Sequence, residues 1–192
     1  MAIKLSWSSE KMDSSQKPIA QLADPRIADF IAEARVGRLA TADASGAPHN
    51  VPICYWFDGE RIYFAIDEKP KRQAGTRIKR MRNIAENPRV ALVIDHYESD
   101  WTQLAYVLIH GAARVVEDSK EYMAALRGLR DKYLQYRRMT LSPERNPIVK
   151  IEPHRVHPWG ARFKPTDVRL AGWGAEWSAG PSARRDPTGT RG

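Results

Sequence analysis

The sequence is short of cysteine and of long apolar runs, and both features narrow the class of protein. Cys54 is the single cysteine among 192 residues, which excludes an intramolecular disulfide framework and fits a reducing compartment. No stretch approaches the roughly 18 apolar residues that a membrane-crossing helix needs. Residues 1–18 also lack the apolar run of a signal peptide. We therefore expect a soluble, cytoplasmic protein with no membrane partner.

Recognisable catalytic motifs are also missing. The chain has no P-loop, no GxGxxG and no GxSxG elbow, so the catalytic residues stay unknown at this stage. His154 and His157 stand three apart in a predicted strand, which points them to opposite faces, and no cysteine or carboxylate cluster accompanies them. We therefore expect no metal site. Cofactors carry hydride chemistry themselves, so this lack of side-chain machinery favours a bound cofactor.

Three other residues of chemical interest have plainer interpretations. Cys54 lies in a predicted strand and is expected to be a small core residue rather than a nucleophile. His96 and His110 lie on or beside predicted strands. Either imidazole could reach a cofactor, but a structural role is the favoured interpretation.

The periodicity of apolar residues predicts a mainly β protein with α additions. A helix is predicted to begin at Asp24 and Pro25 and to end at Gly37. Further helices are predicted at 76–85 and from Ser119 onward. Six strands are predicted, at residues 38–42, 50–57, 61–66, 89–94, 105–116 and 147–156. Tight turns join the first three strands, which favours an antiparallel meander within a closed or split barrel of class α+β.

The two ends of the chain differ from its middle. Residues 1–22 have little periodicity and are interpreted as a flexible N-terminal arm, followed by one domain over 23–163. Residues 164–192 are rich in glycine, serine and proline, which is typical of an extended tail. Trp173 and Trp177 are unusual in such a tail, so part of it is expected to dock on the barrel or on a partner subunit.

The most informative segment is a basic one, residues 69–82. It has seven basic residues and no acid, and the net charge of the whole chain is +8. Cations are disfavoured at the helix N-terminus predicted here, so their crowding makes physical sense if an anion such as a phosphate binds. A solvated basic face is the plainer alternative. Nucleic acid is not expected as a partner, because the segment has no aromatic residue to stack on bases.

Several motifs together resemble the split-barrel superfamily of pyridoxamine 5′-phosphate oxidase-like proteins. The resemblance covers about residues 25–163, and it is closer to the branch of probable enzymes that depend on the deazaflavin coenzyme F420. The motifs are residues 37–41 with 46–52, 67–71, 80–90, 95–101, 133–137 and 156–160. It implies a six-stranded antiparallel split β-barrel with flanking helices, and a homodimer with two cofactor sites at the subunit interface.

The resemblance also implies which residues bind the cofactor. The ring system would be lined by Val51, Pro52, Ile53, Ala65 and Ile66. The phosphate would be held by Lys71, Thr76, Lys79, Arg80, Arg82 and Asn83, with the family's phosphate-binding lysine aligning with either Lys79 or Arg80. Trp101 and Trp159 are predicted to lie at the interface or near the cofactor.

These observations lead to one functional hypothesis and two alternatives. The leading one is an oxidoreductase that transfers hydride from reduced coenzyme F420 to a small unsaturated organic substrate. The first alternative is an FMN-binding flavin oxidoreductase. The second is a non-catalytic split barrel that binds a cofactor or haem. The fold and a phosphate site do not by themselves separate these.

Overall fold

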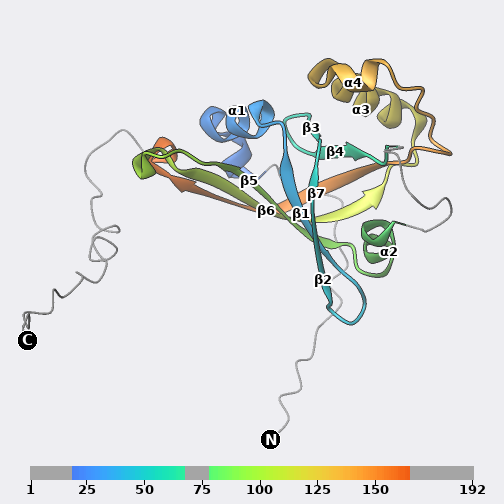
Figure 1. The fold of residues 1–192 in the computed structure, drawn as a ribbon, viewed down its shortest axis with the longest axis horizontal. Coiled ribbons are helices and arrows are strands. Elements are labelled where there is room, and N and C mark those ends of the chain that lie inside the picture. The colour runs from blue at the N-terminus through green and yellow to red at the C-terminus, as the bar shows by residue number, and fades with distance from the viewer. Residues whose placement is uncertain (1–18, 68–77, 165–192) are drawn as a thin grey trace, which may run out of the picture.

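The computed structural model describes residues 19–67 and 78–164, which form a seven-stranded antiparallel sheet curled into a half-barrel (Figure 1). The strand order is β2-β1-β5-β6-β7-β4-β3. The strands are β1 (Gly37–Ala42), β2 (Pro48–Ile53), β3 (Trp56–Phe57), β4 (Ile62–Ala65), β5 (Arg89–His96), β6 (Ala105–Val115) and β7 (Ile148–Gly160). The predicted α+β split barrel is confirmed, with seven strands in place of six.

The helices lie around this sheet and are α1 (Pro25–Glu33), α2 (Lys79–Glu86), α3 (Ser119–Lys132) and α4 (Leu134–Arg137). Short 3₁₀ turns occur at η1 (Ala20–Ala23), η2 (Trp101–Gln103) and η3 (Ala161–Phe163). In Figure 1, α3 and α4 lie together near β4, whereas α2 lies apart from them. Within the described ranges no helix has the length and apolar character needed to cross a membrane.

The first helix begins where the sequence predicts and ends earlier. The Asp24 carboxylate accepts a hydrogen bond from the Arg26 amide at 3.0 Å, and Pro25 occupies the first helical turn. The helix ends at Glu33 because Ala34 already has an extended backbone, so the predicted end at Gly37 is wrong. Gly37 instead opens β1.

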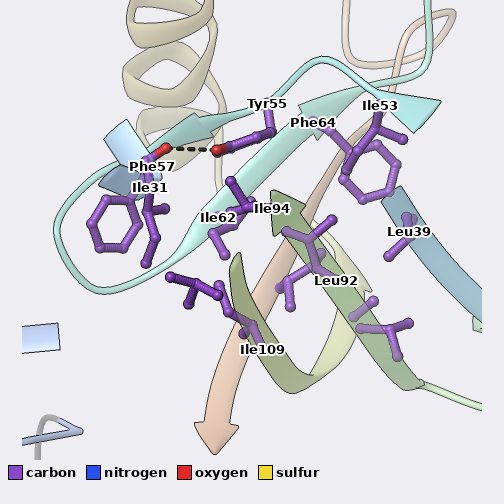
Figure 2. Packing of buried hydrophobic residues seen from close by; sticks show 14 of the residues in the cluster. Ile31, Leu39, Ile53, Tyr55, Phe57, Ile62, Phe64, Leu92, Ile94 and Ile109 are labelled. Carbon is purple, nitrogen blue, oxygen red and sulfur yellow. Dashed lines mark hydrogen bonds between the residues drawn. The ribbon is translucent and has the colours of Figure 1, made fainter. Parts of the chain in front are cut away.

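Alternate residues of the central strands fill the interior of the half-barrel. Leu39, Leu92, Ile109 and Val156 stand opposite one another in adjacent strands, and all four are buried. Figure 2 shows Leu39, Leu92 and Ile109 in this cluster with side chains from β3, β4 and α1. A period of two therefore gives each central strand one buried face, which fixes the register of the sheet.

The predicted second strand, 50–57, is broken in the structure. Cys54 and Tyr55 separate β2 from β3, and these two strands lie at opposite ends of the strand order. The hydroxyl of Tyr133 takes the place of a strand partner, since it lies 3.0 Å from the Tyr55 nitrogen and 2.8 Å from its carbonyl oxygen. The predicted three-stranded meander is therefore wrong, because the chain crosses from one sheet edge to the other.

Strand β4 is buried on both faces. Ile62 and Phe64 face the barrel interior, while Tyr63 and Ala65 pack with α3 residues such as Leu126. Trp56 of β3 lies beside Tyr63, with ring centroids 5.5 Å apart, and it also contacts α3 at Gly128. A Cβ atom at Gly128 would lie 2.2 Å from two ring atoms of Trp56, so this glycine lets the helix approach the sheet.

Gly128→Ala is expected to destabilise the fold by about 1–3 kcal/mol, because the added methyl overpacks the contact with the indole. An alanine in a helix interior is otherwise favoured over glycine by about 1 kcal/mol. The same substitution made in a Trp56→Leu background should therefore be neutral or stabilising. Urea unfolding of the four proteins measures both effects, and equal destabilisation in the two backgrounds would contradict the contact.

Candidate functional site

The predicted phosphate-binding residues are only partly within the described part of the chain. Lys71 and Thr76 lie outside it, whereas Lys79, Arg80, Arg82 and Asn83 lie on α2. Ile78 precedes the helix without a side-chain cap, and the first turn of α2 has no acidic residue. The positive end of the helix dipole is therefore not offset within the helix itself.

Asn83 fastens α2 to the end of β1. Its side chain is completely buried, and its amide nitrogen donates a 3.0 Å hydrogen bond to the Thr41 hydroxyl. That hydroxyl in turn donates to the His49 carbonyl oxygen at 3.3 Å. The amide oxygen Oδ1 of Asn83 is buried and has no hydrogen-bond partner. Leaving a buried acceptor unpaired costs free energy, and the Oδ1 atom can still accept a hydrogen bond from a donor.

Lys79 is bound to a carboxylate that the sequence analysis did not associate with it. Its ammonium lies 2.7 Å from Asp43, in the turn between β1 and β2. The same carboxylate accepts from the Ser45 hydroxyl at 2.6 Å and the Ala47 amide at 3.0 Å. Hydrogen bonds from Lys79, Ser45 and Ala47 hold the pKa of Asp43 far below its usual range. The charge of Lys79 is therefore balanced by a carboxylate from outside the basic segment.

Arg80, also on α2, has unused hydrogen-bonding capacity. Its side chain is half-buried, and its Nε is buried without a hydrogen-bond partner. Burial lowers the pKa of Arg80 from its ordinary value, and the nearby Asp67 and Tyr136 oppose that shift. The Tyr136 hydroxyl donates to Asp67 at 3.4 Å, and burial followed by the Asp67 charge raises the pKa of this tyrosine. A buried guanidinium N–H without a partner is a donor suited to an anionic oxygen.

Helix α2 thus lies near residues that border two separate strands of the sheet, β1 and β4. Lys79 and Asn83 contact the β1 end, and Arg80 lies near Asp67, which follows β4. Arg80 and Asn83 are three residues apart and share a helix face, so their unpaired polar atoms belong to one side of α2. Arg82 is exposed, as expected for a cation that remains in solvent. The arrangement can hold a phosphate through Arg80 and the helix dipole. Lys79 can also contribute, although a phosphate would compete with Asp43 for its ammonium group.

The predicted ring-lining residues divide between different faces. On β2, Val51 and Ile53 pack with the barrel interior, whereas Pro52 is exposed and stands opposite Arg38. Ala65 of β4 and the following Ile66 lie near the opposite end of the strand order. Ala65 packs with the α3 cluster, and Ile66 packs with the barrel interior. Ile53, Ala65 and Ile66 are buried, so a ligand would meet mainly their backbone. The assignment of all five residues to the cofactor stays a prediction.

The other residues of chemical interest do not gather around α2. Cys54 is half-buried and packs against the α3 cluster. His157 stands opposite Leu108 on the outer face of the sheet, and His154 is exposed, so the pair forms no common site. His96 lies 3.3 Å from Glu98 at the far end of β5. Among the described residues there is no group of three or more candidate metal ligands.

Sequence reasoning missed the acidic and aromatic neighbours of the basic segment. Asp43, which the sequence analysis did not single out, binds Lys79. Asp67 and Tyr136 lie within motifs that carry the family resemblance, residues 67–71 and 133–137. This was the one indication in the sequence that they belong to the site. Their joint position beside Arg80 depends on the crossing of the chain and on α4, which no local pattern reveals.

Comparison with known proteins gives both a family and a curated relative. The family model of pyridoxamine 5′-phosphate oxidase matches residues 23–160. A 5a,11a-dehydrotetracycline/5a,11a-dehydrooxytetracycline reductase of Streptomyces rimosus is 35% identical over 125 residues, which cover 65% of this chain and 73% of that protein.

Solved structures at lower identity share the fold. A conserved hypothetical protein of Mycobacterium tuberculosis has a TM-score of 0.57 at 22% identity, covering 82% of this chain and 99% of that one. The haem storage protein HutZ of Vibrio cholerae has a TM-score of 0.55 at 18% identity, covering 70% of this chain and 92% of that one. The family model spans most of the chain, residues 23–160, and the fold agrees with it. This chain therefore belongs to the pyridoxamine 5′-phosphate oxidase family.

Proposed function

We propose that this protein is an oxidoreductase that binds the reduced deazaflavin coenzyme F420 and delivers hydride to an unsaturated organic substrate. The observation that carries the proposal is the start of α2. There the half-buried Arg80 has a buried Nε without a partner, and no acid offsets the helix dipole within the first turn. These features fit a ligand phosphate, which takes up the unused donor and the positive charge together.

The residues of the chain would serve to bind and orient the coenzyme. Arg80 and Lys79 would hold its phosphate, and the backbone of β2 and β4 would seat its ring between apolar residues such as Val51 and Ile66. The coenzyme supplies the hydride when it is bound. In this proposal the protein binds and the coenzyme reacts, which agrees with a site that contains cations and backbone groups rather than a nucleophile and a base.

The curated relative supports reduction as the reaction class. It is named for the reduction of dehydrotetracyclines, and its identity to this chain is well above that of the structural neighbours. We infer a substrate of the same general kind, an organic molecule with a reducible double bond. FMN stays the alternative cofactor, since its phosphate would suit Arg80 equally well.

The haem-storage neighbour favours a different second candidate, a split barrel that binds a planar cofactor without turnover. One experiment separates all three functions. Apo-protein is titrated with coenzyme F420, FMN and haem at the same ionic strength, and the tightest binder is then assayed, in reduced form, for hydride transfer to dehydrotetracyclines. We expect F420 to bind most tightly and to be oxidised in the presence of substrate. A protein that purifies yellow with FMN, or one that binds haem best and catalyses no transfer, would contradict the proposal.

Replacing Lys79 and Arg80 together with alanine is expected to weaken coenzyme binding by about two orders of magnitude. Arg80→Ala alone should account for at least about tenfold of this, because Lys79 already contacts Asp43. Fluorescence quenching of the coenzyme measures the affinities.

The matched control for this pair is Lys120→Ala with Arg127→Ala, which removes the same charge from exposed positions of α3. An equal loss of affinity in the two double variants would show that the effect is general electrostatics. No loss in either would leave the basic segment as a solvated face.

The outer face of the sheet supports the further proposal that the protein is a homodimer. Val93 and Leu108 stand opposite each other on this face, and both are only half-buried. Further along it, Trp159 stacks on Tyr106 with ring centroids 5.3 Å apart and is 48% exposed. Trp101 is 74% exposed at the same end of the sheet. Arg38 and His157 stand opposite Val93 and Leu108 on the same face, so the face combines exposed apolar and polar side chains. Exposed apolar side chains of this kind suit contact with a second copy of the chain.

Light scattering after size exclusion should give about twice 21.8 kDa for the unmodified protein. Leu108→Glu is expected to shift the population to the monomer, because it places a charge among the apolar side chains of this face. Met123→Glu, on the exposed face of α3, is the control and should leave the mass unchanged. A clean monomer that binds the coenzyme as tightly as proposed would refute the dimer without touching the cofactor assignment.

A further inference from the structure

A second candidate site lies at the other end of β1 from α2. A cavity of about 390 Å³, open to the surface, is lined by the end of α1, the start of β1, the end of β5 and η3. Arg35, Arg38 and Arg162 all line it. The contacts of Lys79 and Asn83 are with Asp43 and Thr41, at the opposite end of β1. The cavity is therefore separate from the proposed coenzyme phosphate site.

The three arginines of the cavity differ in how their charges are compensated. Arg38 is ion-paired with Asp95. Arg35 donates to the backbone oxygen of Lys132 at 2.8 Å, and its guanidinium lies 5.2 Å from the centre of the Tyr133 ring. Arg162 lies 4.9 Å from the centre of the Phe30 ring. Within residues 19–67 and 78–164, neither Arg35 nor Arg162 forms an ion pair with a carboxylate.

A buried ammonium group behind Arg35 adds to this positive charge. The Nζ of Lys132 is buried without a hydrogen-bond partner and lies 4.2 Å from the centre of the Tyr55 ring. Burial, and then the charge of Arg35, lower the pKa of Lys132 to about 8, so it remains mostly protonated at neutral pH. Glu33 and Asp95 also line the cavity. Asp95 is paired with Arg38, so of these two carboxylates only Glu33 remains to offset Arg35, Arg162 and this ammonium. The cavity therefore has a surplus of positive charge.

One part of the lining is apolar, whereas Asp95 and His96 of β5 contribute polar groups on another part. Phe30, Ala34 and Val36 contribute to the wall, and the Phe30 ring is held edge-on by Phe163 at 5.3 Å between centroids. A ligand that fits this combination has one anionic group and a flat or compact apolar body. Free phosphate or sulfate would leave the apolar wall uncovered, and an uncharged hydrocarbon would leave the guanidinium groups without a partner.

We propose that this cavity binds a small hydrophobic carboxylate, whose carboxylate is held by Arg35 and Arg162 and whose apolar body lies against Phe30 and Val36. The planar guanidinium of each arginine suits two-pronged hydrogen bonding to a carboxylate. The proposal does not depend on the cofactor or on the reaction assigned to the protein, because no residue of the α2 site contributes to it.

Benzoate is the test ligand, and benzamide is its uncharged counterpart of the same shape. Calorimetric titration of the full-length protein at constant ionic strength should show benzoate binding at millimolar concentration or below and benzamide binding at least about tenfold more weakly. Arg162→Ala should weaken benzoate binding by about tenfold, and Arg35→Gln should do the same. Arg162 is exposed on a 3₁₀ turn, so its replacement is not expected to affect folding.

Two controls make the result decisive. Arg127→Ala removes an exposed charge from α3 and should leave benzoate binding unchanged. Lys79→Ala should also leave it unchanged while still weakening coenzyme binding, which separates this site from the proposed function. Equal binding of benzoate and benzamide would overturn the proposal. So would no binding of benzoate at millimolar concentration, or a loss of benzoate affinity in Lys79→Ala but not in Arg162→Ala.

Discussion

The hydroxyl of Tyr133 is the contact on which the arrangement of the whole sheet depends. It accepts from the Tyr55 nitrogen at 3.0 Å and lies 2.8 Å from the carbonyl oxygens of both Tyr55 and Arg35. A hydroxyl has one hydrogen to donate, so the two carbonyls share it. The contact provides hydrogen bonds for backbone groups that leave the sheet between β2 and β3. The Tyr55 hydroxyl completes the junction by donating to Ile31 of α1 at 2.6 Å (Figure 2).

The crossing at this junction has a consequence for the α2 site. Because the chain passes from β2 at one edge to β3 at the other, the ends of β1 and β4 can both be reached by one short helix. Lys79 and Asn83 contact the β1 end, and Arg80 lies by Asp67 after β4. The cations of α2 are thus partly balanced by two aspartates from elsewhere in the chain. Fewer groups are therefore free to bind an anionic ligand than the sequence suggests. They are the buried N–H of Arg80 and the positive end of the helix dipole.

Much of the fold follows from patterns that are local in the sequence. The N-cap at Asp24 predicts the start of α1, and the stripe Tyr122, Leu126 and Leu129 predicts the buried face of α3. The alternation in β5 and β6 is visible because each strand has one buried face. The break at Tyr55 is not visible, since Cys54 and Tyr55 continue an apolar run and the partner that interrupts it lies 78 residues away. Local patterns describe strands, whereas this break is made by a tertiary hydrogen bond.

The candidate site shows the same division between local and long-range information. The basic residues of α2 and their place at a helix N-terminus are evident in the sequence, because charge and capping are local properties. The pairing of Lys79 with Asp43 spans 36 residues and could not be inferred from composition. The cavity at Arg35 and Arg162 was also missed, since its cations come from segments that are far apart in the chain. Cys54, which draws attention in the sequence, packs instead against the α3 cluster.

The central claim is that the phosphate of a flavin-type coenzyme binds at the start of α2. A crystal structure of the protein with coenzyme F420 tests it most directly. We expect phosphate oxygens within hydrogen-bonding distance, about 3 Å, of Arg80, and an ammonium of Lys79 that contacts both the phosphate and Asp43. A phosphate bound among Arg35 and Arg162 instead, or a coenzyme that makes no contact with α2, would contradict it.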